Sequence, residues 1–194
     1  SYHPVKNFTT GEGGSILTNS KKIFDFCQLH RSHGMNKSKI LTNNNGRWFY
    51  KIDNYGYNYR ITDFQCALGV SQLKKLEKFV IKRRKIAYFY NKNFENLENF
   101  KIPPTLKSNY NSFHLYPLLI DFKKLKVSKN IFFNDMFKKG INLQVHYIPL
   151  YYHRYLSKFK FNIKEFPNTE KFYQQEVSLP IFYDLIYKAQ NQIV

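Results

Sequence analysis

Apolar residues recur with helical spacing in the stretch that follows Ser20. Ser20 is a favourable N-cap, and Gly34 can adopt the left-handed conformation that ends many helices. The pattern therefore predicts an amphipathic helix from Ser20 to about His33. The positions predicted to face inward are Ile23, Phe24, Cys27 and Leu29 or His30.

A longer helical pattern starts at Thr62 and reaches Leu97. Thr62 is followed three residues later by Gln65, the spacing of a capping box. Gly69 lies inside this pattern, so a bend is expected there. Pro103 and Pro104 end the region and predict a linker.

The second half of the chain combines strand and helix patterns and predicts an α+β unit. Residues 113–120 predict a strand that Pro117 confines to an edge or a bulge. A helix over 128–139 is expected to stop at Gly140. The other predicted elements are strands over 15–18 and 141–147, a polar loop over 36–51, and helices over 168–177 and 184–194.

The chain of 194 residues has a formal net charge of +18, which raises nucleic-acid binding as an alternative function. The basic residues are scattered, however, and residues 82–85 (KRRK) form the one dense cluster. No nucleic-acid module signature accompanies them. We therefore interpret the charge mainly as lysine-rich surface and expect no nucleic-acid partner. A third alternative is that part of the charge serves an anionic ligand such as a sugar diphosphate.

The sequence favours a cytoplasmic protein without a membrane partner. No apolar run reaches the 18 residues that a spanning helix needs, and no signal-peptide pattern is present. Cys27 and Cys66 fit buried thiols in a reducing compartment. Cys27, His30 and His33 are spaced three apart on the predicted helix, but without a fourth ligand we expect no metal site.

Lys6 is the strongest candidate for covalent chemistry. It lies between the hydroxyl of Ser1 and the glycine turn GEGG, in the segment SYHPVKNFTTGEGG. A neutral lysine amine can form a Schiff base with an aldehyde, and a nearby hydroxyl and flexible turn can hold a phosphate. The alternative is an ordinary surface lysine, because lysine is abundant in this chain.

Four ordered segments resemble motifs of the DegT/DnrJ/EryC1/StrS sugar aminotransferases. They are SYHPVKNFTTGEGG, RSHGM (31–35), GYNYRITDFQCALG (56–69) and QVHYIPLY (144–151). The resemblance covers nearly the whole chain. It implies an α/β fold of the pyridoxal phosphate-dependent transferase type I: residues 1–70 would end the large cofactor-binding domain, and residues 71–194 would form the small C-terminal domain.

The resemblance also assigns roles to individual residues. Lys6 would bind pyridoxal 5′-phosphate covalently and then move protons during catalysis. Ser1 would bond the cofactor phosphate, and Asn58 would reach the same phosphate from a neighbouring subunit, so a homodimer with a shared active site is expected. Arg60 also matches the motif, but the resemblance does not decide between a structural ion pair and a ligand contact for it.

RSHGM and QVHYIPLY are similar to one branch of the family. That branch aminates a UDP-linked 4-keto-6-deoxy-N-acetyl sugar in pseudaminic acid synthesis. The resemblance implies that His146 and Tyr147 lie near the sugar, that Arg31 belongs to a branch-specific site, and that glutamate donates the amino group. Another nucleotide sugar of the same family, or a member that has lost catalysis, is the alternative.

The resemblance is confined to the C-terminal half of such enzymes. An acidic partner for the pyridine nitrogen and a group stacked on the cofactor ring would come from the half before Lys6, and the last helix looks shortened. We therefore expect this fragment alone to be inactive and to expose apolar side chains around its first 70 residues.

Overall fold

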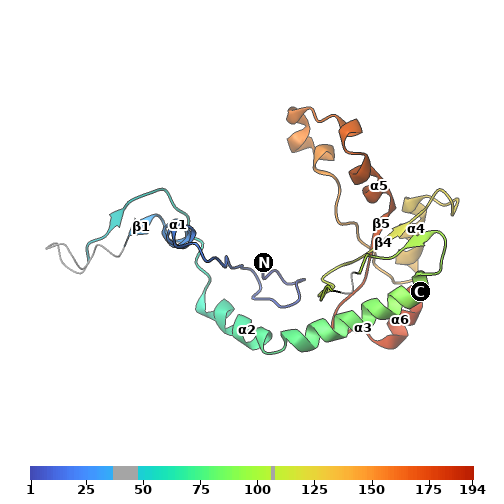
Figure 1. The fold of residues 1–194 in the computed structure, drawn as a ribbon, viewed down its shortest axis with the longest axis horizontal. Helices are drawn as coiled ribbons and strands as arrows, with labels where there is room; N and C mark the ends of the chain where they lie inside the picture. Colours follow the sequence, from blue (N-terminus) through green and yellow to red (C-terminus); the bar gives the residue numbers. More distant parts are fainter. Residues whose placement is uncertain (37–47, 106–107) are drawn as a thin grey trace. The chain divides into compact units, whose positions relative to one another are not determined.

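The computed structural model describes residues 1–36, 48–105 and 108–194, in two compact units (Figure 1). The first unit, Ser1–Lys75, contains α1 (Lys21–Arg31), β1 (Met35–Asn36), β2 (Lys51–Ile52) and α2 (Asp63–Leu73). The second unit is Leu76–Val194. Its elements are α3 (Leu76–Phe94), β3 (Phe100–Lys101), β4 (Tyr116–Ile120), α4 (Lys129–Lys138), the short 3-10 helices η2 (Leu150–Tyr152), η3 (Arg154–Phe159) and η4 (Ile163–Glu165), α5 (Pro167–Gln175), β5 (Glu176–Leu179) and α6 (Tyr187–Ile193).

The predicted helix starts are confirmed by their capping hydrogen bonds. Ser20 Oγ accepts the N–H of Ile23 at 3.4 Å at the start of α1. At the start of α2, Thr62 Oγ1 accepts the N–H of Gln65 at 3.4 Å, and Gln65 Oε1 accepts the N–H of Thr62 at 3.0 Å. Ser128 caps α4 through its side chain in the same way. These caps depend on local sequence alone, which is why they could be predicted.

The long helical pattern is interrupted at Lys74 and Lys75, close to Gly69 but not at the glycine where the bend was expected. Helix α2 continues through Gly69 to Leu73, and α3 begins at Leu76. Gly69 is buried, and a Cβ there would lie 2.9 Å from Thr10 Cγ2. The glycine therefore allows a close approach between α2 and the N-terminal segment instead of bending the helix.

The second unit has a continuous apolar core built on a three-stranded antiparallel sheet of order β3-β4-β5. In the β4–β5 pair, Tyr116 lies opposite Leu179 and Leu118 opposite Val177. Pro117 lies on the central strand, but β3 reaches only as far as Leu119. Pro117 therefore lies where β4 has a neighbouring strand on one side only. A proline is accepted there because it has no N–H that a second neighbouring strand would need. The core is formed by Ile86, Ala87, Tyr90, Phe94, Phe113, Tyr116, Leu118, Ile120, Ile141, Leu143, Val177, Leu179, Ile181, Leu185 and Ile193.

Strand β5 was missed, because a helix had been expected over residues 168–177. Helix α5 ends at Gln175, and Glu176–Leu179 instead pair with β4. All four residues of β5 are buried, so tertiary pairing decides their conformation. The expected strand over 141–147 is reduced to a single bridge between Gln144 and Ser178.

The first unit has very few buried side chains. Helix α1 has no buried residue, so the prediction that Ile23 and Phe24 face inward is wrong; they are 48% and 49% exposed. The expected strand over 15–18 is also absent from this described segment, where Leu17 is 93% exposed. The predicted exposure of apolar side chains around the first 70 residues is confirmed.

Strands β1 and β2 pair antiparallel at the base of the predicted loop over 36–51, with Met35 opposite Ile52. Most of that predicted loop, residues 37–47, lies outside the described residues. Over the part of the chain that the structure describes, no helix combines the length and apolar character needed to cross a membrane.

Candidate active site

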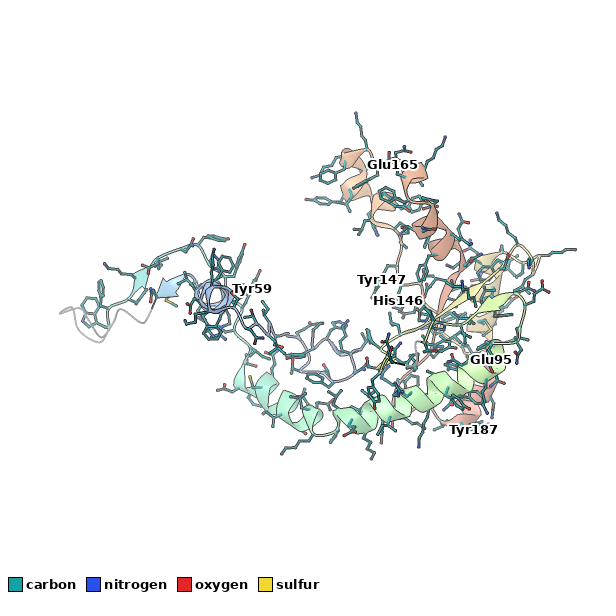
Figure 2. All side chains as sticks on the ribbon, in the orientation of Figure 1. Tyr59, Glu95, His146, Tyr147, Glu165 and Tyr187 are labelled. Carbon is teal, nitrogen blue, oxygen red and sulfur yellow. The ribbon has the colours of Figure 1, made fainter. Side chains whose placement is uncertain are left out.

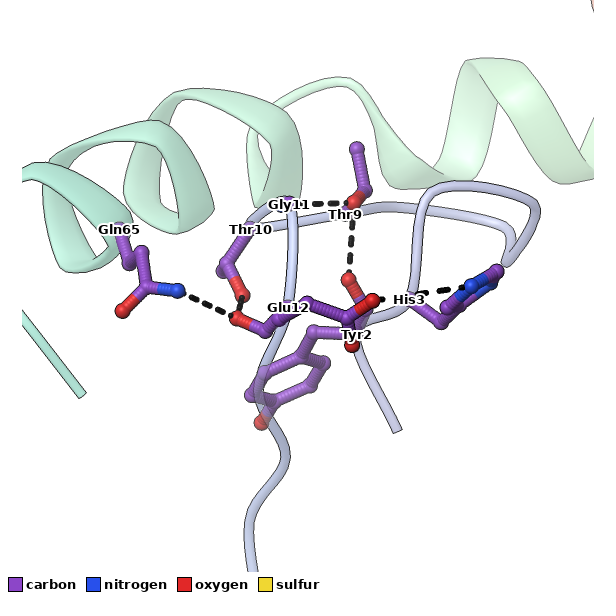
Figure 3. A network of polar contacts seen from close by, with 7 residues as sticks. All are labelled: Tyr2, His3, Thr9, Thr10, Gly11, Glu12 and Gln65. Carbon is purple, nitrogen blue, oxygen red and sulfur yellow. Dashed lines mark hydrogen bonds and ion pairs between the residues drawn. The ribbon is translucent and has the colours of Figure 1, made fainter. Parts of the chain in front are cut away.

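The N-terminal segment folds back on itself so that Tyr2 is hydrogen-bonded to the region of the glycine turn (Figure 3). The N–H of Tyr2 donates to the Gly13 carbonyl at 2.9 Å. The Tyr2 carbonyl accepts the N–H of Thr10 at 3.0 Å and the hydroxyl of Thr9 at 2.8 Å. Residues 2–13 therefore form a closed loop that contains Lys6.

The glycines allow this loop to close tightly. Gly13 has φ of 141°, and a Cβ there would lie 2.9 Å from Thr10 Oγ1 and 3.2 Å from Ile61 Cδ1. A Cβ on Gly14 would lie 3.8 Å from the Ser1 Cα. The turn thus packs directly beside Ser1, in a conformation that side chains at Gly13 would disturb.

Polar contacts fasten the loop to α2. The carbonyl of Glu12 accepts the Thr10 hydroxyl at 2.7 Å and the Gln65 side-chain amide at 2.9 Å (Figure 3). His3 Nε2 lies 3.7 Å from Glu12 Oε1. Gln65 therefore has two roles, because the same side chain completes the capping box of α2.

Lys6 lies in a turn within this loop and is half-buried. Its N–H donates to the His3 carbonyl at 2.9 Å. Lys6 therefore lies on the closed loop of residues 2–13, whose conformation is fixed by hydrogen bonds, and Ser1 directly precedes this loop.

Asn58 and Arg31 belong to two motifs that pair with each other. The N–H of His33 donates to the Tyr57 carbonyl at 2.8 Å, and the N–H of Tyr59 donates to the Arg31 carbonyl at 2.9 Å. Asn58 forms an antiparallel bridge with Ser32. Sequence reasoning treated RSHGM and GYNYR as separate motifs, whereas the structure joins them along their backbones.

Two glycines make this pairing possible. Gly34 has φ of 69°, and a Cβ there would lie 1.7 Å from the Asn54 carbonyl oxygen. A Cβ on Gly56 would lie 2.1 Å from the Gly34 nitrogen. Both distances are far below any real contact, so the two backbones can approach only with glycine at both positions.

The side chains around Asn58 are exposed and aromatic. Tyr57 and Tyr59 stack with ring centroids 4.8 Å apart, and Tyr55 meets Tyr57 edge-on at 5.1 Å. Electrostatic interaction with Tyr55 is the main cause of a raised pKa at Tyr57. The Arg31 guanidinium donates to Gln28 Oε1 at 2.7 Å, within its own helix end.

His146 and Tyr147 lie in the second unit, on the segment between the sheet and the 3-10 helices (Figure 2). His146 is half-buried, and its Nδ1 lies 2.7 Å from Ser178 Oγ. Tyr147 is 71% exposed, and its ring meets the His146 ring edge-on at 4.6 Å.

The three spaced residues Cys27, His30 and His33 do not form a cluster. His30 stacks on Phe26 with ring centroids 3.7 Å apart, and its Nδ1 lies 2.9 Å from the Phe26 carbonyl oxygen. Among residues 1–36, 48–105 and 108–194, no group of three His, Cys, Asp or Glu side chains could hold a metal ion.

The basic cluster at 82–85 is not a continuous solvated stripe. Arg83 is 7% exposed, and its guanidinium donates to the carbonyls of Phe113, His114 and Ile181 at 2.8–3.2 Å. Burial lowers the pKa of Arg83. Arg84 lies over the Tyr110 ring, 4.1 Å from its centroid. These contacts give the cluster a structural role within the second unit.

Comparison with known proteins assigns the chain to a family. The model of the DegT/DnrJ/EryC1/StrS aminotransferase family matches residues 1–194. The chain belongs to this family. The sequence resemblance that rested on four motifs is confirmed over the whole chain, and with it the expectation that the chain comes from an enzyme family.

Two curated relatives carry the same name, UDP-4-amino-4,6-dideoxy-N-acetyl-beta-L-altrosamine transaminase. The protein from Campylobacter jejuni is 38% identical over 180 residues, which are 93% of this chain and 46% of the relative. The protein from Helicobacter pylori is 34% identical over 193 residues, which are 100% of this chain and 49% of the relative. The chain thus spans about half the length of the curated relatives it matches.

The fold expectation is confirmed by a solved structure. Helicobacter pylori PseC, described as an aminotransferase involved in the biosynthesis of pseudoaminic acid, superposes with a TM-score of 0.88 at 32% identity. The match covers 100% of this chain and 50% of PseC. The chain therefore has the mixed α/β fold of this family over that half. How the boundary at residue 70 relates to the family's two domains remains a prediction.

The residues of the N-terminal loop fit the cofactor of this family, whose aminotransferases depend on pyridoxal phosphate. The loop offers a lysine amine for the cofactor aldehyde and a serine hydroxyl for its phosphate. The backbone of Gly14 lies next to Ser1, since a Cβ built on Gly14 would be 3.8 Å from the Ser1 Cα. A lysine amine and a serine hydroxyl are groups that can react with an aldehyde and donate to a phosphate, respectively.

Proposed function

We propose that the chain is part of an aminotransferase that moves an amino group from an amino acid, glutamate, to the C4 keto group of a UDP-linked 4-keto-6-deoxy-N-acetyl sugar. The observation that supports this most directly is the name shared by the two curated relatives at 38% and 34% identity. A transaminase interconverts an amine and the corresponding ketone, so a 4-amino sugar product implies a 4-keto substrate. The product would enter nonulosonate synthesis, as the description of PseC suggests.

In this proposal Lys6 is the catalytic residue. Pyridoxal phosphate, when bound, supplies the electron sink that makes a proton on the reacting substrate carbon removable. The Lys6 amine, in its neutral form, takes that proton and later returns one, which is a general acid–base role. The closed loop of residues 2–13 holds the lysine backbone in place, so the amine is presented from a fixed position.

Ser1 and Asn58 are proposed to hold the cofactor phosphate. In this proposal the Ser1 hydroxyl donates a hydrogen bond to a phosphate oxygen, and the exposure of Ser1 leaves it accessible to such a ligand. Asn58 acts from a second copy of the chain, so the enzyme is a homodimer with a shared active site. The exposed tyrosines around Asn58 are consistent with a surface that another subunit covers.

His146, Tyr147 and Arg31 are proposed to bind the sugar nucleotide. His146 and the exposed ring of Tyr147 offer a hydrogen-bonding group and an aromatic face side by side, a combination suited to sugars. Arg31 can pair with a phosphate of the UDP group. We place the reaction in the cytoplasm, with no nucleic acid and no metal involved.

The decisive experiment replaces Lys6 in the active enzyme that contains this chain. Lys6→Ala is expected to remove the visible absorbance of the bound cofactor and to lower turnover of the UDP-linked 4-keto sugar by at least about 10²–10⁴-fold. Lys22→Ala, which removes an exposed lysine from α1, is the matched control and should keep both properties. A Lys6→Ala enzyme that retained its colour and turnover would refute the proposal. Turnover of a different nucleotide sugar alone would refute only the substrate assignment.

A further inference from the structure

A second cluster of polar side chains lies in the core of the second unit, remote in sequence from Lys6. Glu176 and Ser178 are 0% and 4% exposed and lie two residues apart on β5, so they share one face of the strand. The alternate residues Val177 and Leu179 belong to the apolar core. A carboxylate buried in this way is costly unless it is hydrogen-bonded or paired with a charge.

The cluster satisfies both oxygens of the carboxylate. The backbone N–H of His146 donates to Glu176 Oε2 at 2.9 Å, and the Ser178 hydroxyl donates to Glu176 Oε1 at 2.6 Å. The His146 ring completes the chain of contacts, with Nδ1 2.7 Å from Ser178 Oγ. Burial lowers the pKa of Lys129, and electrostatic attraction to Glu176 partly opposes that shift. Lys129 is therefore a positive charge that interacts with the Glu176 carboxylate. Both oxygens of the Glu176 side chain therefore act as hydrogen-bond acceptors in this cluster.

Counting protons then fixes the role of His146 Nδ1. A serine hydroxyl has one proton, and in this cluster it is donated to the Glu176 carboxylate. Ser178 Oγ can therefore only accept from the imidazole, so His146 Nδ1 must be the donor. In the neutral ring the other nitrogen, Nε2, then has no proton and is a hydrogen-bond acceptor.

We propose that Glu176 and Ser178 are positioning residues that hold His146 in the Nδ1–H tautomer, so that its Nε2 accepts a hydrogen bond from a hydroxyl of the sugar-nucleotide substrate. The inference rests on the proposed function for the identity of the ligand. The tautomer itself depends only on the contacts within the second unit. Neither Glu176 nor Ser178 carried a sequence signal, because a glutamate and a serine at this spacing are common in helices and strands alike.

The tautomer can be tested by ¹⁵N NMR of the imidazole nitrogens in the complete chain. We expect His146 to show a protonated Nδ1 and an unprotonated Nε2, with the resonance assigned by its loss in His146→Gln. His153, which is exposed on the same segment, serves as the internal reference ring. An Nε2–H tautomer at His146 in the unsubstituted chain would overturn the proposal without any further variant.

Glu176→Gln provides the sharper test, because it replaces one acceptor oxygen of the side chain by an NH₂ donor and hardly changes its size. The His146 N–H would keep the amide oxygen at the Oε2 position, so the amide NH₂ would face Ser178 and donate to it. The serine hydroxyl would then donate to Nδ1, and the ring is expected to switch to the Nε2–H tautomer. Ser178→Ala should remove the preference between tautomers, whereas Ser157→Ala, an exposed serine on η3, should leave it unchanged. An unchanged ring state in both Glu176→Gln and Ser178→Ala would contradict the positioning role.

The ligand part of the proposal needs the active enzyme. Glu176→Gln is expected to raise KM for the sugar nucleotide about tenfold, the worth of one hydrogen bond, with a smaller change in kcat. The half-reaction with the amino donor should be unaffected, since it involves no sugar. If Glu176→Gln switches the His146 tautomer as expected but leaves the KM for the sugar nucleotide unchanged, substrate recognition by His146 is refuted. Because the NMR measurement needs no turnover, it stands even if the Lys6 test refutes the proposed function.

Discussion

The two units hold their shapes by different means. Every buried apolar side chain among the described residues lies in the second unit, from Val80 onward, where α3 and the β4–β5 pair form a continuous core. In the described part of the first unit only Thr10, Gly34 and Gly69 are buried, and its order comes from backbone hydrogen bonds, caps and glycine contacts. The proposed cofactor residues thus lie in the unit that has no core of its own. Its stability should respond to polar and backbone changes, and that of the second unit to changes in volume.

The largest difference in stability change between the two units is expected when one aromatic side chain in each unit is replaced by alanine. Tyr90 is 0% exposed, and its hydroxyl donates to the Pro180 carbonyl at 2.8 Å. Tyr90→Ala should lower the free energy of unfolding of the second unit by about 3–5 kcal/mol. Phe64 is 92% exposed, so Phe64→Ala should change stability by less than about 0.5 kcal/mol. Urea denaturation followed by segment-resolved hydrogen exchange measures both; equal effects would refute the contrast.

A smaller loss of folding stability is expected when a buried cation is removed. Arg83→Met leaves the carbonyls of Phe113, His114 and Ile181 without the guanidinium that they share, which should cost about 1–3 kcal/mol. Arg84→Met is the matched control and loses a cation–π contact with Tyr110, worth about 0.5–1 kcal/mol, and an exposed hydrogen bond to the Asn111 carbonyl. The urea midpoints should fall in that order with unchanged denaturant slopes. A more severe effect from Arg84→Met would show that burial does not decide the outcome.

The smallest effect is expected from removing a helix cap in each unit. Thr62→Ala and Ser128→Ala each delete a side-chain acceptor at a helix start and should cost about 1 kcal/mol. In α2 this loss should appear as local opening, with amide exchange about fivefold faster in the first turn and little change elsewhere. In α4, which packs on the core through Phe132 and Phe133, the loss should lower the stability of the whole unit. Local opening in α4 and global loss in α2 would reverse the comparison.

The sequence predicted the features that depend on neighbouring residues. The caps at Ser20, Thr62 and Ser128 and the stop at Gly140 each need only a few adjacent positions, and all four are present. The family resemblance also rested on short motifs and is confirmed. The roles given to Lys6, Ser1, Asn58, His146, Tyr147 and Arg31 are predictions that await the experiments above.

The features that sequence reasoning missed depend on distant partners. Strand β5 continues directly from α5, and only its pairing with β4 makes Glu176–Leu179 extended. Ile23 and Phe24 have the spacing of an inward face, but the first unit provides nothing to cover them. The contact between Ser178 and His146 joins residues 32 positions apart, a distance at which one sequence gives no information on geometry.

The back-to-back contact of Gly34 and Gly56 means that neither glycine can be replaced, whatever residues stand elsewhere in the two motifs. A side chain at either glycine would strike the opposite backbone, and shrinking another residue could not relieve the clash, because no side chain is involved. Random mutagenesis should therefore find no second-site suppressor for either substitution. The same contact sets the ends of the stretch between the motifs at a constant separation. Asn58 and Arg31 therefore keep their relative backbone positions only while both glycines are present.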